Sequence, residues 1–137
     1  MTDTYLTASR AVDAVISEAT RRGITVSVAV VGLGGELVAF GRMDGAPPLS
    51  AEIARNKAAT SWVFGAATRQ LGELSVPGGP LAGIEAATTR PLVRFGGGLP
   101  VRGANPGISA IGVSGGTVEE DEELAAFGVE VIVGAAS

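Results

Sequence analysis

Apolar and polar positions follow two different rhythms along this chain, and the first of them is helical. Between residues 5 and 22 apolar side chains return every three or four positions, and the opposite face is charged. The apolar stripe consists of Ala8, Val12, Val15, Ile16 and Ala19. This spacing predicts an amphipathic helix, which Thr4 or Thr7 would cap and which Gly23 would end.

The rhythm changes at Ile24, where the segment ITVSVAVVGLGGELVAF begins. Two runs rich in β-branched residues, 24–31 and 36–42, flank a glycine-rich loop, and this pattern predicts a β-hairpin. Gly32 and Gly34 also resemble the start of a dinucleotide-binding fingerprint. That motif requires a third glycine and a following helix, whereas a strand follows here, so the hairpin is the favoured interpretation.

A second helix is predicted over residues 51–68, after a loop closed by Pro47 and Pro48 and with Ser50 as its cap. One face of this helix combines apolar residues with a cation and three hydroxyls. Its members, spaced by three or four positions, are Ile53, Lys57, Thr60, Ser61, Phe64 and Thr68. A purely structural helix seldom carries such a set on its buried face, so this face is a candidate for function.

Beyond this helix the pattern weakens, and the predicted elements are short. Residues 70–90 look irregular, with a breaker in VPGGP and a helical stretch at 81–87. Further predicted elements are a strand within 90–97, a strand within 108–116 with a bulge at Gly112, a helix begun by a capping box of Thr117 and Glu120, and a last strand in VEVIV. This order predicts one α+β domain over residues 1–137, with helices flanking an antiparallel sheet.

The composition restricts the chemistry more than it restricts the fold. The 137 residues are 46% hydrophobic and 18% charged, which is typical of a folded domain. The chain has no cysteine and no histidine. This absence excludes disulfides, thiolate nucleophiles, imidazole metal ligands and every triad with a histidine base.

The charges argue against two classes of partner. Lys57 is the only lysine, the arginines are spread along the chain, and the acids concentrate after residue 118. No basic stripe or aromatic platform for nucleic acid is visible, so we expect no nucleic-acid partner. The first ten residues lack the pattern of a secretory signal and no run is long enough to span a membrane. The expected location is the cytoplasm, with no membrane partner.

Four short segments, taken in order, resemble one known family. They are RMDGA from Arg42, ARNKAAT from Ala54, FGGGLP from Phe95 and IGVSGG from Ile111, the last followed by a run of acids. The chain resembles the haem-degrading, GlcG-like (DUF336) family, whose domain also occurs at the end of some cobalamin adenosyltransferases. The resemblance implies a profilin-like α+β fold, homo-oligomers from dimers to octamers, and haem binding in several members.

The matched segments supply the candidate site residues. We expect a pocket between the glycine run and the helix of Lys57 that receives a small-molecule anionic ligand, because arginine forks meet carboxylates bidentately. The candidate ligand-binding residues are Arg42, Met43, Arg55, Arg94, Gly96, Gly97, Gly98 and Pro100. The glycines would let a ligand or a neighbouring backbone come close, and Arg102 is a further candidate beside them.

Two alternatives stay open for the cations. Arg55 or Lys57 could instead form a salt bridge with Asp44 or with the acids at 119–123. A desolvated Lys57 could also act as a base or an imine-forming amine, with Asp44 as a second acid-base group. The turn at 114–117 could bind an anion, but the acids that follow favour a structural helix cap.

Haem is a candidate cofactor, but its usual protein ligands are scarce here. Without histidine or cysteine, the remaining candidates are Met1, Met43 and Tyr5, with Lys57 as a weak fourth, and no other metal site is expected. Met43 could equally be a hydrophobic plug at the end of a strand. The leading hypothesis is an oligomeric ligand-binding protein; the alternatives are a small cofactor-free enzyme acting on an organic acid through Lys57 or Asp44, and a subunit that serves assembly alone.

Overall fold

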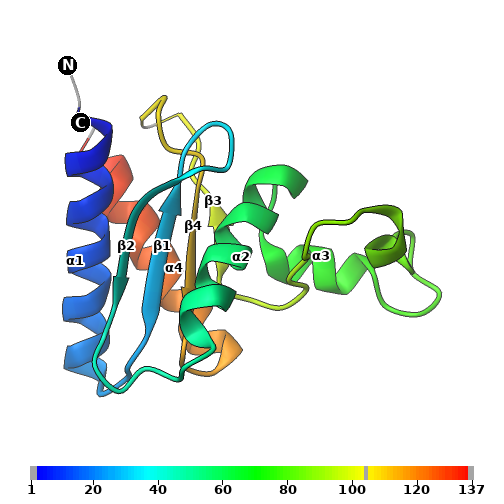
Figure 1. Ribbon diagram of the computed structural model, residues 1–137, viewed down its shortest axis with the longest axis horizontal. Helices are drawn as coiled ribbons and strands as arrows, with labels where there is room; N and C mark the ends of the chain where they lie inside the picture. The colour runs from blue at the N-terminus through cyan, green and yellow to red at the C-terminus, as the bar shows by residue number, and fades with distance from the viewer. Residues whose placement is uncertain (1–2, 104, 136–137) are drawn as a thin grey trace.

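A four-stranded antiparallel sheet separates two layers of helices in the computed structural model, which describes residues 3–103 and 105–135 (Figure 1). The strands lie in the order β2-β1-β4-β3. The elements are α1 (Thr4–Arg22), β1 (Ser27–Val31), β2 (Leu37–Arg42), α2 (Ser50–Phe64), α3 (Thr68–Leu74), the 3-10 helix η1 (Ile84–Ala87), β3 (Gly98–Pro100), β4 (Ala110–Ser114) and α4 (Val118–Gly134). The predicted α+β class with an antiparallel sheet is confirmed.

The helix α1 forms as its apolar stripe predicts, and it packs with α4 on one face of the sheet. Its cap differs from the prediction: the carboxylate of Asp3 accepts a hydrogen bond from Leu6 N at 2.9 Å, so neither Thr4 nor Thr7 is the N-cap. The helix begins at Thr4, one residue earlier than expected, and both threonines lie inside it. Gly23 ends it with φ of 74°, as predicted.

The predicted hairpin is present, with β1 in the interior of the sheet between β2 and β4. All five residues of β1 are buried, because helices cover both faces of the sheet there. The predicted bulge at Gly112 is wrong, since Gly112 pairs regularly with Ala29 and with Gly98, and the irregularity lies instead between Val30 and Val31. A side chain at Gly112 would collide with the backbone of α2, so close helix packing explains this glycine.

The helix α2 covers the other face of the sheet, and both predicted ends of it need correction. It ends at Phe64 rather than 68, because Gly65 takes a left-handed conformation with φ of 83°. Ser50 is not its cap: the helix starts at Ser50, whose hydroxyl lies 2.9 Å from the Ser27 hydroxyl of β1. Thr68 consequently belongs to the separate short helix α3.

The segment after α3 projects from the sheet on the side away from α1 (Figure 1). None of residues 76–92 is buried, and the predicted helical stretch at 81–87 is confirmed in part by η1. The predicted strand within 90–97 is wrong. Its backbone groups instead form hydrogen bonds with threonine hydroxyls of α2 and α3. Val93 N donates to Thr60 Oγ1 at 3.1 Å, and Thr68 Oγ1 donates to Phe95 O at 2.6 Å.

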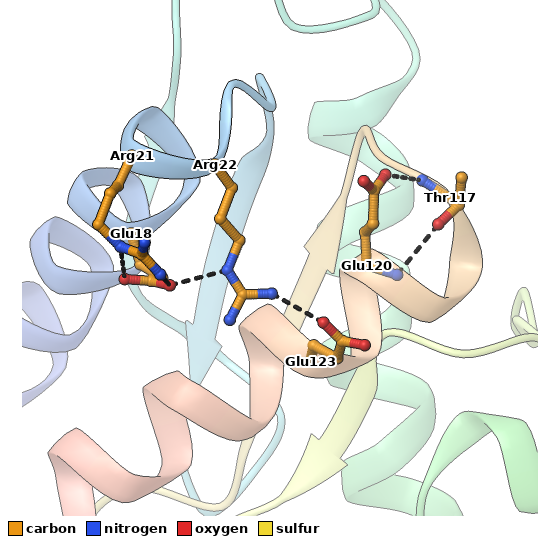
Figure 2. Close-up of polar contacts among 6 residues, drawn as sticks. All are labelled: Glu18, Arg21, Arg22, Thr117, Glu120 and Glu123. Carbon is orange, nitrogen blue, oxygen red and sulfur yellow. Dashed lines mark hydrogen bonds and ion pairs between the residues drawn. The ribbon is translucent and has the colours of Figure 1, made fainter.

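The predicted last strand is also wrong, because α4 continues through VEVIV to Gly134. Leu124, Gly128 and Ile132 recur at helical spacing and are buried, which fixes this segment as a helix. The predicted capping box is confirmed: the Thr117 hydroxyl accepts from Glu120 N at 3.1 Å, and the Glu120 carboxylate accepts from Thr117 N at 2.9 Å (Figure 2).

An ion-pair chain joins α1 to α4 at the surface (Figure 2). Glu18 pairs with Arg21 and Arg22, and Arg22 also reaches Glu123 at 2.8 Å. The hydrogen bond from Arg21, with help from Arg22, lowers the pKa of Glu18 to about 2. Exposed pairs of this kind contribute little to stability, so the apolar contact between the helices dominates. Within the described ranges, no helix combines the length and apolar character that a membrane crossing requires.

Candidate functional site

The glycine run at 96–98 packs directly against the side chain of Lys57. A Cβ atom at Gly97 would lie 2.5 Å from Lys57 Nζ and 2.6 Å from Val113 O, and the φ of Gly97 is 129°. A Cβ atom at Gly98 would lie 2.5 Å from Lys57 O. The glycines therefore admit a close approach, but the approaching group is this protein's own α2 rather than a ligand.

Lys57 is fully buried and its ammonium is surrounded by partners. Nζ donates to Val113 O at 2.8 Å and to Asp121 Oδ2 at 3.0 Å, and it lies 5.2 Å from the centre of the Phe95 ring. The other carboxylate oxygen of Asp121 accepts from Gly116 N at 2.9 Å. This buried ion pair ties α2, the end of β4 and the first turn of α4 together.

Burial lowers the pKa of Lys57, and the charge of Asp121 opposes this shift in part. A lowered pKa suits a catalytic amine, but the amine also has to reach a substrate. Lys57 has an exposed fraction of 0%, and Val113 O and Asp121 accept from two of its three N–H donors. Of the alternatives for Lys57, the salt bridge with the acids at 119–123 is the one that the structure contains.

The residues of the RMDGA segment lie elsewhere. Arg42 donates to Ala46 O at 2.6 Å, and Asp44 is exposed in the loop after β2. Met43 packs against the core, and its sulfur accepts from Val26 N at 3.3 Å. Arg55 is exposed on α2, two positions from the buried Lys57, and residues so spaced face different sides of a helix. No cationic cluster of these side chains forms within the described residues.

Backbone amides of the turn at 114–117 donate hydrogen bonds to carboxylates of α4, the helix that follows the turn. The amide of Gly116 donates to Asp121, and the amide of Thr117 donates to Glu120. Two of the amides that an anion could use are therefore taken, which agrees with the structural cap that the acids favour.

A groove of about 670 Å³ lies between α3, residues 94–96 and the start of α4. Its lining residues are Arg69, Gly72, Glu73, Val76, Arg94, Phe95, Gly96, Val118, Glu119, Glu122, Glu123 and Ala126. Its apolar part is open to solvent: Phe95 is 46% exposed, Val76 49% and Val118 39%. Of the candidate ligand-binding residues, Arg94 and Gly96 line this groove, and we call it the α3/α4 groove.

The two arginines of the α3/α4 groove differ in their freedom. Arg69 is held by Glu122 and Glu73, each at 2.9 Å, and these hydrogen bonds raise its pKa. Among the residues that the structure describes, the ion pair of Arg94 is an exposed contact with Glu85 at 3.5 Å, beyond the usual length of a charge-assisted hydrogen bond. Arg94 is thus the guanidinium that can turn toward a ligand.

The floor of the groove explains the first glycine of the run. A Cβ atom at Gly96 would lie 3.1 Å from Val118 O and 3.2 Å from Glu122 Oε1, so a side chain there would crowd the start of α4. Glu122 Oε1 is itself buried and lacks a hydrogen-bond partner among the described residues. Sequence reasoning missed Arg69, Phe95, Val118 and Glu122, although an aromatic residue directly before three glycines was a signal for one of them.

Comparisons with known proteins agree with this architecture. The family model described as "Haem degrading protein HbpS-like" matches residues 4–130. The chain belongs to this HbpS-like family. The membership confirms the family that the four sequence segments indicate.

Several relatives of this HbpS-like chain are similar over most of its length. It is 38% identical over 124 residues to an uncharacterized 15.0 kDa protein of Citrobacter freundii encoded between dhaT and dhaS, covering 90% of this chain and 87% of that one. The crystal structure of Klebsiella pneumoniae ORFY has a TM-score of 0.88 and 35% identity, covering 95% of this chain and 90% of that one. The structure of a PduOC:heme complex has a TM-score of 0.84 and 30% identity, covering 96% and 94%.

The α3/α4 groove of this HbpS-like protein does not fit the ligation of haem iron. Its lining offers guanidinium, carboxylate, phenyl, alkyl and backbone groups, whereas haem iron usually takes an imidazole, thiolate, thioether or phenolate. Tyr5 is exposed on α1, and the Met43 sulfur accepts a hydrogen bond from Val26 N. Met1 lies outside the described residues.

Proposed function

We propose that this protein binds a flat, largely apolar organic molecule with a carboxylate at its edge, and that the ligand lies in the α3/α4 groove. The observation that carries the proposal is an apolar floor, exposed to solvent, beside Arg94, whose ion pair among the described residues is a 3.5 Å contact with the exposed Glu85. The volume of about 670 Å³ falls in the range of about 300–1,000 Å³ that is typical of ligand pockets.

The apolar part of the groove favours a ligand with a ring system. Phe95, Val76 and Val118 come from three separate segments and expose apolar surface in one place. Such a grouping is more informative than scattered exposed apolar residues. A flat ring can stack on the Phe95 side chain and cover the two valines, which removes apolar surface from water.

The charged rim favours one anionic group rather than several. Four glutamates line the groove beside Arg69 and Arg94, so the rim does not attract polyanions in general. Glu73 and Glu122 already engage Arg69, whereas Arg94 can offer its fork to a carboxylate. The ligand is therefore amphipathic, with an apolar body and an acidic edge.

The relatives support this class of ligand. A PduOC:heme complex is among the structures that this chain resembles over nearly its whole length, and haem is a flat apolar ring with carboxylate side arms. The alternative of a cofactor-free enzyme depends on Lys57 or Asp44, and neither residue lines the groove. Binding is consequently the function that the described residues support best.

Titration with 1-pyrenebutyrate, a fluorescent ring system with one carboxylate, tests the proposal. We expect the carboxylate to bind about tenfold more tightly than the neutral 1-pyrenebutanol, because a hydrogen bond to a charged group contributes about 1.5–3 kcal/mol and 1.4 kcal/mol is a factor of ten. The Arg94→Ala variant should lose most of this difference, as measured by fluorescence anisotropy.

The Arg10→Ala variant is the matched control, since Arg10 is exposed on α1 and does not line the groove. It should bind both probes as the natural chain does. Equal affinity of the natural chain for the acid and the alcohol would refute the role of Arg94. No binding of either probe would refute the groove as a site for this class of ligand.

A further inference from the structure

We infer that the α3/α4 groove recognises the organic ring and carboxylates of a tetrapyrrole and supplies no ligand to a metal at its centre, so that the iron-free ring binds as well as haem does. This inference rests on the proposed function and names one ligand class for it. It follows from a mismatch between the groove's side chains and the chemistry of haem iron.

The first step concerns the donor atoms that the whole chain can offer. Histidine and cysteine are absent from all 137 residues. A second copy of the same chain would therefore add no imidazole and no thiolate to the groove. Imidazole and thiolate, two of the usual protein ligands of haem iron, are therefore not available from these 137 residues or from a second copy of them.

The second step concerns the remaining candidates among the described residues. Lys57 is buried in its ion pair with Asp121, and the Met43 sulfur accepts a hydrogen bond from Val26 N, directly before β1. Tyr5 lies on α1, which is on the opposite side of the molecule from α3 in Figure 1. None of the three side chains lines the groove.

The third step concerns the carboxylates that do line the groove. Arg69 binds Glu73 and Glu122, and Arg22 binds Glu123. Moving one of these carboxylates to a metal would break an existing ion pair, and carboxylates are not among the usual ligands of haem iron. Three of the four glutamates that line the groove are thus engaged with arginines of this chain, and the fourth, Glu119, offers the same kind of carboxylate.

The organic part of a tetrapyrrole matches the groove without a metal bond. The ring can stack on Phe95, and one carboxylate can meet Arg94. These contacts are the same for haem and for the iron-free ring. Affinity should therefore depend on Arg94 and on the apolar floor, and not on the iron.

Parallel absorbance titrations with haemin and with protoporphyrin IX, both dilute enough to remain monomeric, test this inference. We expect dissociation constants within about threefold of each other, which is less than 1 kcal/mol. Bound haemin should show a high-spin spectrum without the signature of a strong axial ligand. Arg94→Ala should weaken both ligands by the same factor, and Arg10→Ala should weaken neither.

Haemin binding at least about tenfold tighter than protoporphyrin IX, or a low-spin spectrum of bound haemin, would overturn the inference. Failure of both tetrapyrroles to bind would also overturn the inference. Binding of 1-pyrenebutyrate through Arg94 would still stand in each of these cases, and it keeps the proposed function distinct from the tetrapyrrole inference. Loss of 1-pyrenebutyrate binding would instead remove both.

Discussion

The Lys57→Met variant should lose about 3–5 kcal/mol of its free energy of unfolding, the usual effect of breaking a buried ion pair by removing one partner. Methionine fills a similar volume, so a cavity contributes little to the loss. Asp121 would remain buried without its cation, and Val113 O would lose its donor. Urea unfolding followed by far-ultraviolet circular dichroism measures this change.

A double variant separates the charge from the packing. In Lys57→Met with Asp121→Asn, the asparagine can still accept the hydrogen bond from Gly116 N, but no buried charge is left unpaired. We expect this variant to recover most of the lost stability, because replacing both members of a buried pair is often nearly neutral. A single Lys57→Met variant as stable as the natural chain would contradict the buried pair.

The Gly97→Ala variant should lose about 3 kcal/mol of its free energy of unfolding, because a strained backbone and an overpacked neighbour act together. An alanine at position 97 would have to adopt a backbone φ of 129°. Its Cβ atom would lie 2.5 Å from Lys57 Nζ and 2.6 Å from Val113 O. Both atoms belong to the hydrogen bond that holds the ammonium, so neither can move freely. Thermal and urea unfolding check the expected loss.

Gly23→Ala is the matched control for the backbone term. Gly23 also has a positive φ, of 74°, but a side chain there would meet no atom within 4 Å. Its substitution should therefore destabilise by about 1 kcal/mol, the cost of the left-handed conformation alone. An equal loss of unfolding free energy for both variants would contradict the close contact of Gly97 with Lys57 and Val113.

The local signals of the sequence predict most of the helices. The stripe from Ala8 to Ala19 gives α1, and Thr117 with Glu120 gives the start of α4, because helical spacing and capping depend on near neighbours along the chain. Reliance on these local signals also explains the wrong prediction of a strand at VEVIV. Its β-branched composition favours a strand, but tertiary packing of Ile132 in the core decides for a helix.

The hydroxyls of the second predicted helix show where sequence reasoning on function departs from the structure. Thr60 and Thr68 look like site residues on an apolar face, and they instead form hydrogen bonds with the backbone of the segment before the glycine run and of the run's last residue. That segment therefore forms no strand. The pattern identifies an unusual surface, but only the fold reveals that its partner is another part of the same chain.

The candidate site was predictable only in part for a similar reason. Arg94 and Gly96 stand beside the conspicuous run of glycines, and both line the groove. Arg69 and Val118 come from α3 and α4, which are distant in sequence, and no local pattern connects them. Lys57 stands out as the sole lysine, but its partner Asp121 lies at the start of α4, on the other side of the sheet from α2, and only the fold brings the two together.

The location of the ligand is the central claim, and amide chemical-shift perturbation tests it most directly. Adding 1-pyrenebutyrate to isotope-labelled protein should shift the amides of Phe95, Gly96 and Val118, which line the α3/α4 groove, and should leave Asp44 and Arg55 unchanged. Shifts confined to the loop of Asp44 and the exposed face of α2, with none along the groove, would contradict the proposed site.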